Sequence, residues 1–200
     1  MSEQFARYPS LQHKTVFVTG GASGIGAEIV RAFAAQDCKV GFLDRDEAAG
    51  QALLAEMGAG HSFIPCDLRD LDALQAAFQT LETQLGTSAV LVNNAARDDR
   101  HDWQTVTGDY WDERMATNLR HMFFAIQAVA PGMITAGGGS IINLGSNSWW
   151  EAGGGFPVYA TAKSAVHGLT RTLARDLGVH HIRVNTVVPG WIMTRQPGSH

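Results

Sequence analysis

Three side chains in the second half of the sequence have the types and spacing that acid–base chemistry requires. Tyr159 and Lys163 are four residues apart in a helical pattern, so their side chains share one face. A lysine beside a tyrosine stabilises the phenolate and lowers a pKa that is normally about 10. Such a tyrosine can take a proton from an alcohol, which is general-base catalysis. Ser146 precedes the tyrosine by 13 positions and could hydrogen-bond the reacting oxygen.

Each of these residues also has a purely structural interpretation. Tyrosine and lysine at helical spacing commonly form an exposed helix face, and a serine that follows a glycine commonly forms a turn or a helix cap. Asn118 lies inside a predicted helix, where asparagine is a mediocre helix former. Its position within an otherwise apolar face indicates a special role.

A glycine-rich turn near the N-terminus has the features of a phosphate-binding site. Thr15–Thr19 is a β-branched and aromatic run typical of a strand, and Gly20, Gly24 and Gly26 then crowd the turn that opens an amphipathic helix. Amides at the start of a helix attract an anion, and glycines let a pyrophosphate approach the backbone. Asp44 ends the next apolar run, 18 positions after Gly26, where a ribose-binding carboxylate is expected.

The elements that must position these residues alternate along the chain. Apolar runs predict strands over 15–19, 39–44, 62–64, 89–92, 140–144 and 182–188. Between them, helices are predicted after the glycine turn and over 47–57, 71–85, 110–130 and 158–177, the fourth with Trp111, Met115, Leu119, Met122 and Ile126 on its core side. This pattern predicts one α/β domain, a Rossmann-type doubly wound parallel sheet with helices on both faces and its ligand at the carboxyl ends of the strands.

The amino-acid composition excludes several classes of binding partner and site. The chain has 200 residues, enough for one sizeable domain, and a formal charge of −4 without a basic block, which argues against nucleic acid and anionic membrane. It has neither an apolar run of membrane-spanning length nor a signal-peptide core, and a cytoplasmic location is expected. Cys38 and Cys66 belong to no CxxC motif and the eight histidines are scattered, so no metal site is predicted.

Several motifs together resemble the short-chain dehydrogenase/reductase family over about residues 13–194. They are TGGASGIG at 19–26, NNAA at 93–96, Asn118, Ser146, the Tyr159-Ala-Thr-Ala-Lys163 pentad and Pro189-Gly190, in the family's order. The resemblance implies hydride transfer between NAD(P) and an alcohol or ketone. It assigns Tyr159 as general base or acid, Lys163 to lower its pKa and hold the nicotinamide ribose, Ser146 to position the substrate oxygen, and Asn118 to support a proton relay through water. Two small departures are Ala96, where the family more often has glycine, and Gly145, where it more often has serine.

The resemblance extends the cofactor site. Asp67 and Leu68 are similar to the family's adenine contact, and Asn94 to its stabilising asparagine. The predicted cofactor-binding residues are Gly20, Ser23, Gly24, Ile25, Gly26, Asp44, Asp67, Leu68, Asn94, Ala95, Tyr159, Lys163, Pro189, Gly190 and Ile192. Asp44 would accept hydrogen bonds from a free 2′-hydroxyl and repel a 2′-phosphate, which favours NAD over NADP. Arg45 could pair with that phosphate, although we interpret it as a solvated residue at a helix start.

The substrate site draws on polar residues at 97–101 and on Trp149-Trp150-Glu151, which follow Ser146. A polar pocket with an indole wall suits a polyhydroxylated small molecule, and the predicted substrate contacts are Ser146, Trp150 and Tyr159. The stretches at 100–103, 110–114 and 118–121 are also similar to sugar dehydrogenases of the family. Packing tryptophans and solvated charges are the plain alternative.

The leading hypothesis is therefore an NAD-dependent dehydrogenase acting on a sugar or similar polyol. The alternatives are an NADPH-dependent 3-oxoacyl reductase, which Asp44 argues against, and an inactive nucleotide-binding protein. Members of the family continue past Pro189-Gly190 into a substrate-covering segment and a seventh strand, whereas this sequence stops at 196–200. We accordingly expect a domain truncated after that loop, with its final strand missing, weak NAD binding and little activity. A full-length form is expected to be a homo-oligomer.

Overall fold

The computed structural model describes residues 6–193, in which strands and helices alternate along the chain. The strands are β1 (Thr15–Thr19), β2 (Lys39–Asp44), β3 (Ser62–Pro65), β4 (Val90–Asn93), β5 (Gly139–Leu144) and β6 (Ile182–Val187). The helices are α1 (Gly24–Ala34), α2 (Glu47–Met57), α3 (Leu71–Leu85), α4 (Gly108–Met115), α5 (His121–Thr135) and α6 (Pro157–Gly178). Short 3₁₀ turns lie at η1 (Pro9–Leu11) and η2 (Trp103–Thr105), and η3 (Ala116–Arg120) is π-helical.

The strands form one parallel sheet in the order β3-β2-β1-β4-β5-β6. Thr19, the last residue of β1, pairs with Leu43 of β2 and Asn93 of β4, so these three strands end level with one another. The chain runs outward from β1 to β3 and then returns to β4, which places the reversal of strand order between β1 and β4. Ligands of open α/β sheets bind at such a reversal. The predicted Rossmann-type sheet is confirmed.

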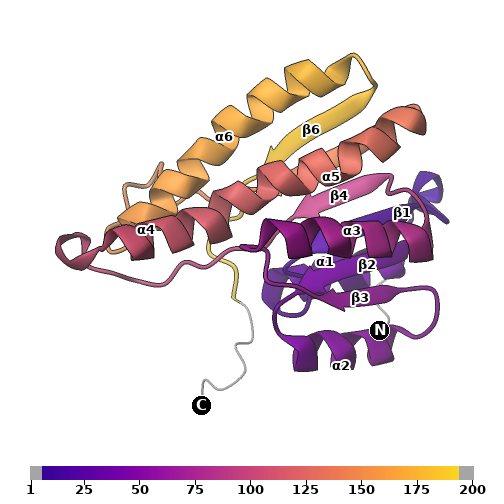
Figure 1. Cartoon of the computed structure of the whole chain (residues 1–200), viewed down its shortest axis with the longest axis horizontal. Helices are drawn as coiled ribbons and strands as arrows, with labels where there is room; N and C mark the ends of the chain where they lie inside the picture. The colour runs from indigo at the N-terminus through magenta and orange to yellow at the C-terminus, as the bar shows by residue number, and fades with distance from the viewer. Residues whose placement is uncertain (1–5, 194–200) are drawn as a thin grey trace.

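Two apolar clusters cover the two faces of the sheet. On one face Phe17 and Leu91 pack against α3, α5 and the end of α6. On the other face Val16 and Val18 pack against α1 and α2. Neighbouring residues of β1 therefore point to opposite clusters, as the period of a strand requires, and β1 is buried throughout. Figure 1 shows this layering, with α3 and α5 on one side of the strands and α1 beyond them.

Side-chain caps begin two of the outer helices. The carboxylate of Asp46 accepts a hydrogen bond from the Ala49 amide at the start of α2. Asp70 accepts bonds from the Asp72 and Ala73 amides at the start of α3. Such caps satisfy amides that a helix cannot pair internally, which is why both helices begin at the predicted residues.

The long helix predicted over 110–130 differs from the structure. It begins at Gly108, passes through the π-helical η3, and continues through Pro131 to Thr135. The extra residue in the π-helical turn rotates the following helix relative to a regular one, so positions at helical spacing no longer share one face. Met122 and Ile126 are buried as predicted, but Trp111 is 40% exposed, and Met115 and Leu119 are only half-buried.

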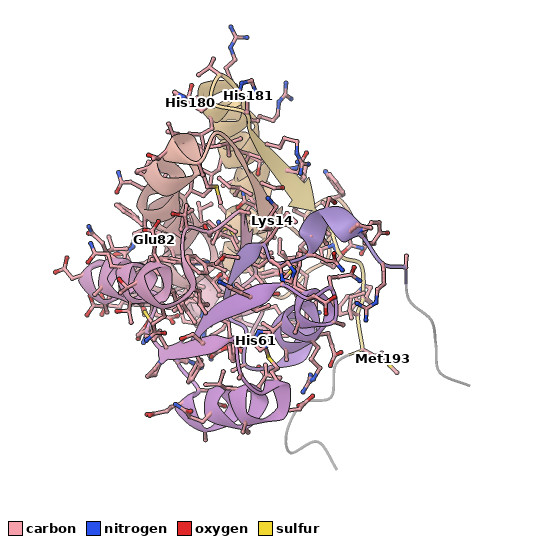
Figure 2. The ribbon with its side chains drawn as sticks, turned by 90° about the vertical axis from the view of Figure 1, so that its right-hand side faces the viewer. Lys14, His61, Glu82, His180, His181 and Met193 are labelled. Carbon is pink, nitrogen blue, oxygen red and sulfur yellow. The ribbon has the colours of Figure 1, made fainter. Side chains whose placement is uncertain are left out.

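The end of the sheet at which the strands begin faces the viewer in Figure 2. Lys14, His61 and His181, labelled there, directly precede β1, β3 and β6. The residues predicted to do chemistry follow the strands and so lie at the opposite end of the sheet. The observed strand bounds are within one residue of the predicted ones. The prediction concerning residues 196–200 lies outside the described residues.

Candidate active site

A cavity of about 620 Å³ lies where the strands end. Its wall includes residues that follow all six strands, among them Gly20, Arg45, Cys66, Asn94, Gly145 and Pro189. It brings together every predicted cofactor-binding residue, and Ser146 with them. Two predicted residues, Asn118 and Trp150, are absent from the cavity wall.

At one end of the cavity, the glycine turn after β1 leaves no room for side chains at Gly20 and Gly26. Gly20 has a φ of +65°, and a Cβ there would come within 2.7 Å of the Ala95 Cα. A Cβ on Gly26 would lie 1.8 Å from the Gly20 carbonyl oxygen, so only glycine fits. Asn94 donates hydrogen bonds from Nδ2 to the carbonyl oxygens of Thr19 and Gly20, at 3.1 and 2.8 Å, and holds the turn against β4.

The start of α1 presents its backbone amides to this cavity. Ser23 precedes the helix, and its side chain makes no capping hydrogen bond. The first amides of a helix have no partner within it and carry the positive end of its dipole. With Gly24 and Gly26 on the cavity wall, the backbone can be approached closely, and a diphosphate fits this end by shape and by charge.

Two carboxylates on the cavity wall differ in their hydrogen-bond partners. Asp44 accepts hydrogen bonds from the Ala22 and Asp46 amides, at 3.0 and 3.1 Å, and thereby holds the turn to the end of β2. Asp67 is engaged by the guanidinium of Arg69, which holds the pKa of that carboxyl below its usual range. The oxygens of both carboxylates retain lone pairs for a ligand.

Three of the four predicted catalytic residues, Ser146, Tyr159 and Lys163, lie together where β5 ends and α6 begins. Lys163 is 1% exposed, and its Nζ donates a hydrogen bond of 2.7 Å to the Leu144 carbonyl. Burial lowers the lysine pKa to about 8, and the nearby charge of Asp98 opposes this shift. Ser146 is buried, and its Oγ lies 2.9 Å from that of Ser148.

Tyr159 has an environment that the sequence did not predict. Burial raises its pKa, a hydrogen bond with Ser146 lowers it, and Asp98 raises it further, so the net shift is upward. The Lys163 Nζ lies 5.8 Å from the centroid of the tyrosine ring. The expected lowering of the tyrosine pKa by the lysine is not among the causes of the shift in this arrangement, where desolvation of the phenolate is the largest cause and raises the pKa.

Asn118 occupies the π-helical turn η3 and is fully buried. Its Oδ1 accepts a hydrogen bond of 2.7 Å from the Arg97 amide, which ties the turn to the loop after β4. Its Nδ2 has no partner among residues 6–193. The mediocre helix propensity of asparagine is thus accommodated where the helix departs from α geometry.

Sequence reasoning missed the buried polar residues behind the site. His121 is fully buried, and burial lowers its pKa to about 3, while contacts with the backbone of Ala116 and Thr117 oppose this shift. Asn93 donates to Asn143 at 2.9 Å, and Asn143 donates to Thr170 at 3.0 Å, across the middle of the sheet. The sequence did contain a signal for these residues, because they are polar and stand at positions where the predicted strands and helices are otherwise apolar.

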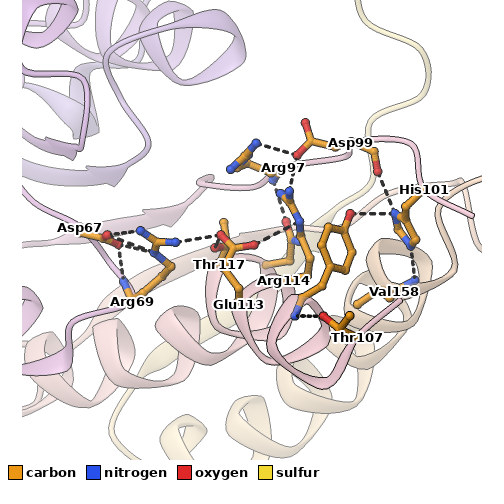
Figure 3. A network of polar contacts seen from close by, with 12 residues as sticks. Asp67, Arg69, Arg97, Asp99, His101, Thr107, Glu113, Arg114, Thr117 and Val158 are labelled. Carbon is orange, nitrogen blue, oxygen red and sulfur yellow. Dashed lines mark hydrogen bonds and ion pairs between the residues drawn. The ribbon is translucent and has the colours of Figure 1, made fainter. Parts of the chain in front are cut away.

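An ion-pair network connects the two ends of the cavity (Figure 3). It runs from Asp67 through Arg69 to Glu113, then through the buried Arg114 to Asp99 and Arg97. The carboxylate of Asp99 contacts Arg114 at 2.6 Å and Arg97 at 2.8 Å. Charges alternate along this chain, so it holds the loop after β4 against α4.

Aromatic residues other than the predicted tryptophan line the substrate end. Phe156 and Trp191 lie on the cavity wall, and the guanidinium of Arg100 stacks over both rings, at 3.9 and 5.6 Å from their centroids. Trp150 packs instead against Trp149 and His167, with centroids 4.8 and 5.2 Å away. The predicted indole wall of Trp150 therefore lies outside the cavity, whose lining residues in this segment end at Ser148.

Within residues 6–193, no group of three or more His, Cys, Asp or Glu side chains could hold a metal ion. None of the described helices is long and apolar enough to cross a membrane.

Comparison with known proteins gives consistent matches. The family model for short chain dehydrogenases matches residues 14–198. A D-xylose 1-dehydrogenase of Caulobacter vibrioides is 50% identical over 195 residues, covering 96% of this chain and 77% of the relative. A Rhizobium meliloti protein, named a probable galactose dehydrogenase, is 46% identical over 195 residues, covering 96% and 76%. A solved 3-ketoacyl-(acyl-carrier-protein) reductase from Brucella melitensis, 24% identical, has the same fold, with a TM-score of 0.86 over 90% of this chain and 76% of that one.

Proposed function

The chain belongs to the short-chain dehydrogenase family, and on that basis we propose that it transfers a hydride between NAD and a hydroxyl-bearing carbon of a sugar or similar polyol. One observation carries the proposal. A single cavity joins the glycine turn, which fits a diphosphate, to Ser146, Tyr159 and Lys163. Relatives named as xylose and galactose dehydrogenases support the choice of a sugar.

The dinucleotide would lie along the cavity. The amides at the start of α1 would bind its diphosphate, Asp44 its adenosine ribose, and Asp67 and Leu68 its adenine. Lys163 and Tyr159 would orient its nicotinamide ribose, with Pro189, Gly190 and Ile192 along the other wall. When bound, the nicotinamide ring supplies the hydride acceptor for oxidation of an alcohol.

The chain's own contribution is the movement of a proton. The Tyr159 phenolate takes the proton of the reacting hydroxyl, and Ser146 donates a hydrogen bond to the same oxygen. Because burial raises the tyrosine pKa, the phenolate needs a nearby positive charge. The Lys163 ammonium supplies it, and with a pKa of about 8 the lysine remains largely charged at neutral pH.

The preference for NAD rests on Asp44. A carboxylate beside the ribose accepts hydrogen bonds from a 2′-hydroxyl and repels a 2′-phosphate. Arg45 also lines the cavity and would favour the phosphate, so the two residues oppose each other. We propose that Asp44 prevails, because two backbone amides hold its carboxylate beside the turn.

Self-association is a further part of the proposal. An apolar hollow lies where α4, η3, α5 and α6 meet, lined by Met115, Leu119, Phe123 and Leu169, and Phe123 is 42% exposed. An apolar surface of this kind is typical of a contact between protomers. Light scattering after size-exclusion chromatography would measure the mass of the assembly, and Phe123→Glu is expected to reduce it. A cytoplasmic location stays a prediction.

The test is a substrate survey with both cofactors. Purified protein would be assayed for NADH and NADPH formation with D-xylose, D-galactose, other aldoses, alditols and simple alcohols, with Tyr159→Phe as the background. Aldoses with NAD are expected to give the largest kcat/KM. Faster reduction of a 3-oxoacyl thioester with NADPH would favour the reductase alternative, and cofactor binding without turnover of any substrate would favour the inactive one.

A further inference from the structure

The loop after β4 contains five consecutive polar residues, 97–101, of which Arg97, Asp98 and Arg100 line the cavity, and the five differ in what they contact. Asp99 is engaged by Arg97 and by the buried Arg114 (Figure 3). The Arg97 amide also donates to Asn118. These two members of the loop hold it against α4 and η3.

Two further members hold the loop against the segment before α6. His101 accepts a hydrogen bond at Nε2 from the Val158 amide, and its Nδ1 lies 2.9 Å from the Tyr110 hydroxyl. Arg100 stacks over Phe156 and donates a hydrogen bond of 2.9 Å to the Gly154 carbonyl. Both side chains serve to position the loop.

Asp98 differs from its neighbours. Its carboxylate has no hydrogen bond or ion pair with any residue between 6 and 193, although arginines flank it at 97 and 100. It lies on the wall of the same cavity as Ser146, Tyr159 and Lys163. An ionised carboxylate can accept several hydrogen bonds and donate none, so a ligand that satisfies it must carry donors.

The charge of Asp98 also reaches the reacting groups. It contributes an upward shift to the pKa of both Tyr159 and Lys163, and at Lys163 it opposes the larger lowering by burial. Coulombic effects fall with distance and are screened by water and salt, and Asp98 lies on the wall of the same cavity as both groups.

We propose that Asp98 determines substrate specificity by accepting a hydrogen bond from a second hydroxyl of the substrate, one that is not oxidised. This inference rests on the proposed function. The Asp98 side chain is exposed to solvent, so a simple alcohol, which has no second hydroxyl, leaves its carboxylate to water and gains no hydrogen bond from it. A sugar acid or sugar phosphate brings a negative charge toward it and is repelled. The residue thus selects neutral polyols.

The first test combines variants with analogues. Asp98→Asn removes the charge at nearly constant shape, and the matched control Asp109→Asn removes an exposed carboxylate of α4 that does not line the cavity. Both would be assayed on one sugar and on the series of its monodeoxy forms. For the sugar, Asp98→Asn is expected to lower kcat/KM by about 10- to 100-fold, the range of a hydrogen bond to a charged group. For one monodeoxy form the ratio of native to variant kcat/KM should fall toward one. Uronic acids should become relatively better substrates of this variant.

The second test needs no substrate. The chain has three tyrosines, so a titration of the native protein minus that of Tyr159→Phe reports the pKa of Tyr159. Asp98→Asn should lower this pKa, because a like charge that disfavours the phenolate is removed, whereas Asp109→Asn should leave it unchanged. An unchanged value in Asp98→Asn would overturn the placement of its carboxylate near the tyrosine.

The outcomes separate the inference from the function on which it rests. Sugar oxidation by the native protein with equal kcat/KM values in both variants would overturn the role of Asp98 and leave the proposed function standing. The same loss for every monodeoxy sugar would also overturn it, since no particular hydroxyl would be recognised. Failure of the native protein to oxidise any sugar would overturn the proposed function, and the role of Asp98 with it.

Discussion

The ion-pair network beside α4 and the centre at the start of α6 each bury a cation, but they treat it differently. The side chain of Arg114 lies between the carboxylates of Asp99 and Glu113, at 2.6 and 3.1 Å, with its guanidinium over the Tyr110 ring. Lys163 is buried at least as deeply, and its only hydrogen-bond partner within residues 6–193 is the Leu144 carbonyl.

The two buried cations thus have different roles: one is paired and holds a loop in position, and the other is unpaired and lies beside the groups that move a proton. In the network each charge has an opposite partner, and the result is a positioned loop. At the start of α6, burial lowers the pKa of Lys163 to about 8, so the ammonium loses its proton more easily, and it raises the pKa of Tyr159, so the neutral phenol is favoured over the phenolate. Perturbed groups of this kind in a cavity are typical of sites that move protons.

The largest expected effect on activity comes from removing the hydroxyl of Tyr159. Tyr159→Phe should lower kcat/KM by about 10³-fold while NAD binding and stability change little, because only the proton acceptor is lost. Steady-state kinetics and calorimetric titration with NAD would measure both. Loss of cofactor binding together with activity would instead indicate that the tyrosine is structural.

Replacing each of the two buried cations by methionine is expected to change stability in opposite directions. Arg114→Met leaves Asp99 and Glu113 without their shared partner and should lower the free energy of unfolding by about 2 kcal/mol. Lys163→Met removes a buried charge that has no carboxylate partner and should raise the same quantity by about 2 kcal/mol at pH 7, while activity is lost. Urea unfolding of both variants would measure this. Changes of the same sign would contradict the comparison.

The pH dependence of stability sharpens the same contrast. Lys163 has a pKa of about 8 in the folded chain against 10.5 as a free group, so between these values the unfolded chain binds the proton more strongly. Its contribution to the free energy of unfolding therefore rises with pH from about 8 to 10.5. The difference between native protein and Lys163→Met, measured by urea unfolding across that window, should shrink as the pH rises. A constant difference would show that the lysine pKa is not lowered.

A smaller effect is expected at the cofactor end. Asp44→Ala should raise the use of NADP relative to NAD by about tenfold, because a like charge beside the 2′-phosphate is removed. Asp44→Asn is the matched variant, since its amide oxygen can still accept the bond from the Ala22 amide. Cofactor titrations would compare the two. An unchanged preference in both would mean that Asp44 serves only to hold the glycine turn.

The smallest effect is expected at Trp150. Because its ring packs on Trp149 and His167 outside the cavity, Trp150→Ala should change kcat/KM for a sugar by less than about twofold. Phe156→Ala, which opens the cavity wall beneath Arg100, should reduce it more. A larger loss in the Trp150 variant would restore the original prediction of an indole wall.

The sequence alone predicted the parallel sheet and the glycine turn. Both depend on local information, since the period of apolar residues identifies a strand or helix, and the spacing of Gly20, Gly24 and Gly26 marks a tight turn at the start of a helix. The end of the sheet at which the site lies followed as well, because all parallel strands finish at the same edge. The predicted bounds of most elements agree closely with the structure for the same reason.

Only the tertiary structure decided which of several similar side chains form ion pairs and which face the cavity. Asp98 and Asp99 are neighbours of the same type, yet one is held by Arg97 and Arg114 and the other faces the cavity, because α4 packs against one side of the loop. Likewise, the π-helical turn around Asn118 and the desolvation of Tyr159 depend on packing between residues far apart in the chain. Pairing and burial are properties of three-dimensional neighbours, and neither propensity nor spacing along the chain contains them.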